Sequence, residues 1–183
     1  MLLKPADGTD VSRIPPPGLA AVARDVFGVR PKGAFQGLPP ETTTQLDEWL
    51  RRVFADRVVN FVIDDGGRIV GHAMLCPGPG KAEAEVAIFV HQDWRGRRAG
   101  RTLLLGALNH GCKQLQLDRV WLSVQGSNPH ARHLFESVGF RPVGEEQPFA
   151  WELELARPSQ CEKCQGDRCE VFGAALPRIV RLD

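Results

Sequence analysis

The feature that most constrains this fold is an apolar run that leads through a loop of arginines and glycines into a leucine-rich helical pattern. The stretch reads "EVAIFVHQDWRGRRAGRTLLLGAL" over residues 85–108. Val86–Val90 is typical of a buried strand, and the leucines that follow Gly100 recur at helical spacing. A helix in this position points the free N–H groups of its first turn beyond the strand end, where such groups bind anions.

The loop has the composition of a phosphate site. Gly96, Ala99 and Gly100 allow the backbone to approach a ligand closely, and arginines add fixed positive charge. These arginines are Arg95, Arg97, Arg98 and Arg101. A solvated basic turn is the alternative interpretation. The G-x-G-x-x-G fingerprint of dinucleotide-binding folds is absent, and so is the Gly-Lys-Ser/Thr of a P-loop.

Further elements surround this strand and helix. "TTTQLDEWLRRVFAD" predicts an amphipathic helix, and Asp65-Gly66 predicts a hairpin between "VVNFVI" and "RIVGHAML". After the strand "RVWLSV", Asn128-Pro129 supplies an N-cap and a first-turn proline, and Gly139 ends an apolar helical stripe. The element order predicts an α/β (α+β) fold with a mixed sheet and helices on both faces.

Composition narrows the class of partners. The 183 residues fit one domain, and 23 basic residues against 22 acidic ones give no general attraction to nucleic acid or to acidic membranes. We find no secretory signal and no run near the ~20 apolar residues that cross a bilayer. Five cysteines, an odd number, fit a reducing compartment. We therefore expect a cytoplasmic protein without nucleic-acid or membrane partners.

Two motifs resemble those of a known family. "AEVAIFVHQDWRGRRAGRTLL", followed by "WLSVQGSNPHARHLFESVGFRPVG", is similar to the cofactor motifs of the GNAT superfamily of acyl-CoA-dependent N-acyltransferases. That family carries Q/R-x-x-G-x-G/A and then N-x-x-A-x-x-L-Y-x-x-x-G-F. The resemblance is strong from Glu83 to Gly144. It implies a mostly antiparallel central sheet of six to seven strands in a domain over residues 1–156, with a C-terminal extension over 157–183.

The resemblance also implies acetyl-CoA as cofactor. The end of the strand would pair its backbone with the pantetheine arm, and the loop amides would hold the pyrophosphate. The second motif would hydrogen-bond the pantetheine and pack beside the thiol. The implied binding residues are Ile88, Phe89, Val90, Arg95, Arg97, Arg98, Ala99, Gly100, Arg101, Thr102, Asn128 and Phe135. Arg98 stands where the family usually has glycine.

Acyl transfer to an amine needs a base, because an amine with a pKa of ~10 is mostly protonated at neutral pH. Glu85 is the candidate, since it stands where the family often carries such a glutamate. Glu83 points to the same side of the strand. The alternative is that both are surface carboxylates. The resemblance further implies that a backbone N–H near Val90 polarises the thioester carbonyl.

The usual acid for the leaving thiolate is missing. The family motif has Leu-Tyr where this chain has Leu134-Phe135, and the chain contains no tyrosine. Three alternatives remain open: water or a substrate group supplies the proton, His133 or Cys112 does so, or the protein binds acyl-CoA without efficient turnover. We favour the first and expect His133 to lie at the surface. His72 is a further candidate for the acceptor site.

The C-terminal extension carries Cys161, Cys164 and Cys169. Zinc takes four ligands, and only three cysteines are local, so the sequence predicts no metal and keeps these three as candidates. A histidine, Cys76 or a second chain would have to complete such a site, which leaves a homodimer open.

The sequence thus predicts an N-acetyltransferase that moves acetyl from acetyl-CoA to a primary amine of a small molecule, a peptide or a protein lysine. An acyl-CoA sensor with weak or no turnover is the alternative. Nucleic-acid binding is disfavoured by the near-neutral charge.

Overall fold

The computed structural model describes residues 26, 43–53, 57–65, 68–144, 151–156, 164–165, 168–169 and 181–182. The sequence also predicts a short first strand beginning at Leu2, a helix over Gly18–Phe27 and an acceptor lining over residues 15–41 and 144–150. Apart from Val26 and Gly144, these lie outside the described residues, and so does Cys161.

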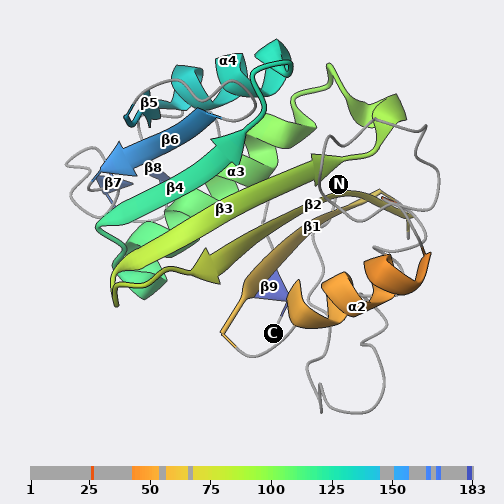
Figure 1. Cartoon of the computed structure of the whole chain (residues 1–183), viewed down its shortest axis with the longest axis horizontal. Helices are drawn as coiled ribbons and strands as arrows, with labels where there is room; N and C mark the ends of the chain where they lie inside the picture. Colours follow the sequence, from red (N-terminus) through yellow and green to blue (C-terminus); the bar gives the residue numbers. More distant parts are fainter. Residues whose placement is uncertain are drawn as a thin grey trace.

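A seven-stranded sheet with the order β5-β6-β4-β3-β2-β1-β9 forms the centre of the molecule (Figure 1). Its strands are β1 (Val59–Asp65), β2 (Arg68–Pro77), β3 (Glu83–Val90), β4 (Arg119–Val124), β5 (Arg141–Pro142), β6 (Trp151–Ala156) and β9 (Arg181–Leu182). Neighbouring strands are antiparallel except β3 and β4. The mostly antiparallel sheet is therefore confirmed. In the extension, the backbones of β7 (Cys164–Gln165) and β8 (Arg168–Cys169) pair separately.

Helices cover both faces, as expected. Helix α2 (Thr43–Val53) lies in front of the sheet in Figure 1, and α3 (Ala99–His110) lies behind it with α4 (Pro129–Val138). Leu103 and Leu104 of α3 pack on Val86 and the other apolar residues of the rear face, which form one buried cluster. On the front face, Trp49 of α2 meets the ring of Phe89 edge-on at 5.7 Å. The hydrophobic core therefore lies mainly between the sheet and α3.

Local sequence signals explain the helix ends. Asn128 caps α4 by accepting a hydrogen bond from Ala131 N–H at 3.1 Å, and Gly139 closes it with φ of 110°. The helix expected over 100–117 begins one residue earlier and passes into a π turn, Gly111–Leu115. Gly111 allows this, because a Cβ there would lie 2.8 Å from Leu117 Cδ1.

The parallel ladder between β3 and β4 is short. It joins only three residue pairs, from Glu83 with Arg119 to Glu85 with Trp121. Beyond them the two strands diverge, and we call this divergence the splay. In Figure 1, α3 is visible between the two ribbons. The last five residues of β3 thus pair with β2 on one side and leave their other edge open toward β4.

None of the helices in the described ranges is long and apolar enough to cross a membrane.

Candidate active site

The loop that joins β3 to α3 presents backbone donors at the open end of the splayed strands. Thr102 N–H donates to Arg98 O at 2.9 Å. The N–H groups of Ala99, Gly100 and Arg101 find no backbone acceptor among the described residues. Thr102, one of the six expected phosphate-binding amides, is therefore already used within the helix, and three free donors remain in the first turn.

Arg98 adopts a left-handed conformation, with φ of 64° and ψ of 4°, directly before α3. This is the position where the resemblance predicts glycine, and glycine enters the left-handed region without strain. The arginine therefore keeps the backbone geometry that a glycine would supply. Gly96 also has a positive φ, 72°, and a Cβ there would meet nothing within 4 Å.

Gly100 serves packing. A Cβ at Gly100 would lie 3.3 Å from Leu134 Cδ2 of α4 and 3.6 Å from Val90 Cγ2 of β3. The missing side chain thus lets the start of α3 sit close to both elements, and the free N–H groups lie next to the end of β3.

The side chains of the loop lie outside this backbone cradle. Arg95, Arg97 and Arg98 are exposed. The guanidinium of Arg97 stacks 5.2 Å from the centre of the Trp94 ring, and Arg101 donates to Ser137 Oγ at 3.1 Å. They form an exposed cationic rim around the free amides.

Val90 points a backbone donor into the opening. His91 N–H donates to Val70 O of β2 at 2.9 Å. Because successive N–H groups of a strand face opposite edges, Val90 N–H faces the diverging β4. Ile88 faces the same edge, whereas Phe89 faces β2 and its side chain is buried under α2.

These groups fit coenzyme A. Its diphosphate matches three free amides at a helix N-terminus with an arginine rim, and its amide-bearing arm matches an unpaired strand edge. Asn128 is exposed at the start of α4, where its side-chain oxygen is the helix cap. Phe135, also expected to contact the cofactor, is only 7% exposed and packs 5.9 Å from Phe140 in the core.

Glu85 lies on the front face, beside Trp121 of β4 and Cys76 of β2. Partial burial and, next, the Glu152 carboxylate raise the pKa of Glu85 above its usual range. Burial, and then the charge of Glu85, raise the pKa of the Cys76 thiol to about 11. Glu85 has no ion pair within the described segments, so this carboxylate is disposed to hold or accept a proton.

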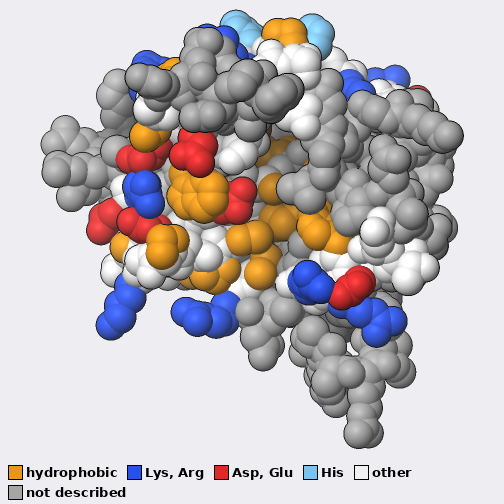
Figure 2. Space-filling model, in the orientation of Figure 1, with side chains coloured by type: hydrophobic (Ala, Val, Ile, Leu, Met, Phe, Trp, Pro, Cys, Tyr) orange, Lys and Arg blue, Asp and Glu red, His pale blue; other side chains and the backbone are white. Residues whose placement is uncertain are grey.

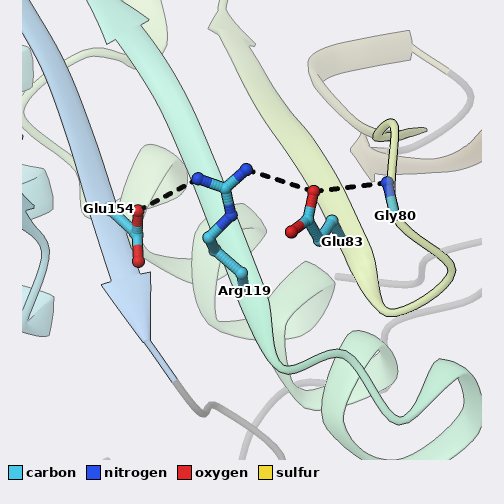
Figure 3. A network of polar contacts seen from close by, with 4 residues as sticks. All are labelled: Gly80, Glu83, Arg119 and Glu154. Carbon is cyan, nitrogen blue, oxygen red and sulfur yellow. Dashed lines mark hydrogen bonds and ion pairs between the residues drawn. The ribbon is translucent and has the colours of Figure 1, made fainter.

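Arg119 ties the strands together at the closed end of the splay (Figure 3). Its guanidinium donates to Glu83 Oε2 at 3.1 Å and to Glu154 Oε2 at 3.2 Å, and Gly80 N–H donates to the same Glu83 oxygen at 3.3 Å. The hydrogen bond from Arg119 is the main cause that lowers the pKa of Glu83. We call Gly80, Glu83, Arg119 and Glu154 the clasp.

A shallow pocket of about 190 Å³ lies on this face beside Glu85. On the left of the molecule in Figure 2, acidic side chains gather next to apolar ones. The lining residues are Pro79, Arg119, Trp121, Val143, Glu152, Leu153 and Glu154. The sequence predicts Glu83 and Glu85 on this face of the sheet. It gives no role to Arg119, Trp121, Glu152 and Glu154, although their alternation along β4 and β6 marks the same face.

The histidines occupy different places. His72 is fully buried, with Nε2 2.9 Å from Asn60 Oδ1, and burial lowers its pKa to about 3. It lies beneath the front face, stacked on Phe89. His133 is exposed, as expected. His91 is 1% exposed and contacts Arg68 NH2 at 3.0 Å and Asp93 N at 3.2 Å. The side chain of Cys112 lies outside the described part.

Comparisons with known proteins agree with this geometry. Residues 28–140 match the model described as "Acetyltransferase (GNAT) family". The chain is 31% identical over 128 residues to a mycothiol acetyltransferase of Rhodococcus opacus, covering 70% of this chain and 34% of that protein. It is 29% identical over 109 residues to a spermidine N(1)-acetyltransferase of Vibrio cholerae, covering 58% of this chain and 63% of that protein. The chain thus spans less than two thirds of either relative.

Solved structures show the same fold. A variant of the spermidine N-acetyltransferase SpeG from Vibrio cholerae superposes with a TM-score of 0.55 at 26% identity, covering 65% of this chain and 76% of that one.

Proposed function

Because the chain belongs to the acetyltransferase (GNAT) family, we propose that it transfers an acetyl group from acetyl-CoA to a primary amine whose acceptor molecule is cationic. The observation that carries this proposal is the pairing of two sites across one opening. Amides with no backbone acceptor among the described residues lie at the mouth of the splay with an unpaired strand edge. Glu85, which has no ion pair within that part of the chain, lies beside them on the front face.

The groups on the cofactor side bind and orient acetyl-CoA. Ala99, Gly100 and Arg101 N–H hold the diphosphate, and the open edge of β3 aligns the pantetheine arm. When bound, acetyl-CoA supplies the activated acyl group. Val90 N–H faces the opening, where it donates to the carbonyl oxygen as negative charge develops there.

Glu85 takes a proton from the incoming ammonium, directly or through one water. A carboxylate with a raised pKa is a stronger base than an ordinary surface glutamate. The Glu85 side chain therefore delivers the neutral amine that the reaction requires.

The acceptor is expected to be cationic because its pocket is acidic. Two glutamates, Glu152 and Glu154, line the pocket together with Trp121, and Arg119 is the single basic side chain among the described lining residues. Carboxylates attract ammonium groups, and an indole face binds cations. The similarity to a spermidine acetyltransferase supports polyamines as the first class to test.

The leaving thiolate receives its proton from water or from the acceptor. Phe135 cannot donate one, His133 is exposed on α4, and the side chain of Cys112 lies outside the described part. We expect Phe135→Tyr to raise kcat several-fold if the new hydroxyl reaches the thiol, because general-acid assistance is then restored. Unchanged kcat would assign this proton to solvent or to the acceptor.

The test is a thiol-release assay over spermidine, shorter diamines, a monoamine of matched length and a lysine peptide. We expect release with the polyamines and at least a 100-fold loss of kcat in Glu85→Gln, with Glu48→Gln on the surface of α2 as the matched control. Binding of acetyl-CoA by calorimetry with no release for any amine would favour the sensor function instead. Equal activity of wild type and Glu85→Gln would remove Glu85 as the base.

A further inference from the structure

Arg119 bonds the front-face carboxylates of Glu83 and Glu154 (Figure 3), and no ion pair joins it to Glu85. An arginine beside a catalytic base would normally capture it, because opposite charges within ~4–6 Å favour ion pairing. The arrangement of the clasp therefore has a bearing on the acid–base chemistry of the site.

Glu85 and Glu154 are both diagonal neighbours of Arg119, one on each side of β4. On the β6 side, Arg119 pairs in register with Ala156, but its guanidinium reaches Glu154, two residues away. On the β3 side, Arg119 pairs in register with Glu83, and Glu85 is the residue two positions away. Long side chains span such diagonal neighbours. An Arg119 side chain that extends far enough to bond Glu154 would thus also be able to bond Glu85.

The turn between β2 and β3 holds Glu83 in place. Gly78 N–H donates to Glu83 O at 2.8 Å, and Gly80 N–H donates to the carboxylate oxygen that also accepts from Arg119. Gly80 has no room for a side chain, because a Cβ there would lie 2.9 Å from Glu83 Cδ. The position of the Glu83 carboxylate therefore depends on glycine at position 80.

We propose that Glu83, seated by Gly80, is a positioning residue that holds Arg119 away from Glu85 and so keeps the Glu85 carboxylate free of an ion pair. The proposal rests on the proposed function in one respect, the role of Glu85 as base. The titratable or charged described groups on strand positions that share the face with Glu85 are His72 and Cys76 on β2, Glu83 on β3, Arg119 on β4, Arg141 on β5, and Glu152 and Glu154 on β6.

Release of the clasp has a definite consequence. An arginine that moves onto Glu85 stabilises its charged form and lowers its pKa by ~1–3 units. The carboxylate then ionises at lower pH but accepts a proton less readily. In the pH–rate profile, the acid side of the kcat/KM curve moves to lower pH, and the pH-independent value of kcat falls.

Gly80→Ala is the sharpest variant, because it displaces Glu83 without changing any charge. We expect two midpoints to fall by about one pH unit or more. The first is the midpoint of the acid side of the kcat/KM profile, and the second is the midpoint of the Glu85 carboxyl titration followed by NMR. The KM for acetyl-CoA should stay within about twofold, since the helix amides are untouched. Glu83→Gln should shift both midpoints in the same direction, and Glu83→Asp should shift them less.

The control removes the cation. In an Arg119→Gln background, Gly80→Ala should leave the titration of Glu85 unchanged, because no guanidinium remains to move. Folding of each variant is checked by thermal melting. An unchanged Glu85 titration in folded Gly80→Ala and Glu83→Gln would overturn the proposal, as would a shift of equal size without Arg119. The NMR titration needs no turnover, so these outcomes are distinct from a failure of Glu85→Gln to lower activity.

Discussion

The two sides of the splay are built in different ways. The proposed cofactor side comes almost wholly from one continuous stretch, residues 88–102, and it works through backbone N–H groups. The acceptor side is assembled from side chains of β3, β4 and β6, as far apart as residues 83 and 154. A backbone site tolerates changes of side chain if its conformation is kept, whereas a side-chain site depends on each residue. The predictions below test this difference.

The largest effect is expected on the acceptor side, in the pH dependence of kcat/KM. The pKa of Glu85 is raised in the folded protein, and the base must be ionised, so activity is lost as pH falls through that raised value. Each further pH unit below it should cost about tenfold. Steady-state rates across pH should show this limb in wild type. A limb of the same shape in Glu85→Gln would contradict the assignment.

The next effect concerns packing beneath the backbone cradle. Gly100→Val adds branched methyls where a Cβ alone already lies 3.3 Å from Leu134. We expect the free energy of unfolding to fall by about 1–3 kcal/mol and coenzyme A affinity to fall with it. Denaturant unfolding and calorimetry measure the two quantities. Gly100→Ala serves as the graded control, since Leu134 needs to move only a few tenths of an ångström.

Two variants of Asn128 distinguish a role in capping α4 from a role in binding the ligand. Asn128→Ala removes the acceptor for Ala131 N–H and should cost about 1 kcal/mol of stability. Asn128→Asp keeps the cap and removes the amide donor. If the exposed amide binds the pantetheine arm, only the aspartate variant should lose affinity for coenzyme A at full stability. Equal affinity in wild type and Asn128→Asp would assign Asn128 to capping alone.

The smallest effect is expected at Arg98. Left-handed backbone costs an arginine about 1 kcal/mol and costs glycine nothing, although glycine is more flexible when unfolded. Arg98→Gly should therefore raise the free energy of unfolding by about 0.5 kcal/mol and change coenzyme A affinity by less than about tenfold. Arg98→Val should lower both, because a branched residue resists positive φ. A larger loss of affinity in Arg98→Gly than in Arg98→Val would show that the side chain, not the backbone, carries binding.

Local interactions explain what could be predicted from the sequence. The cap at Asn128, the glycine after α4, the antiparallel β1–β2 pair and the passage from β3 into α3 all depend on residues close together in the chain. The left-handed conformation of Arg98 could not be predicted, because an arginine carries no local signal for a positive φ. The π turn after His110 was missed too, since helical periodicity does not distinguish it from a continued α-helix.

The clasp could not be predicted, because it depends on which strands become neighbours. Glu83 was noted as a carboxylate on the same side as Glu85, but nothing near it in sequence points to Arg119, 36 residues later. The pairing of Arg181–Leu182 with β1 is a further long-range contact of this kind. The division into residues 1–156 and an extension stays a prediction, and so does the absence of a metal at the three cysteines.

The three-pair ladder between β3 and β4 has one more consequence. The proposed cofactor groups lie at the open end of the splay and Glu85 lies where the ladder ends, so donor and acceptor would occupy separate places and neither has to depart before the other enters. Steady-state kinetics should then show intersecting double-reciprocal lines and no covalent acetyl-protein. A single molecule that joins coenzyme A to a polyamine by a short spacer should span both places and bind far more tightly than either half.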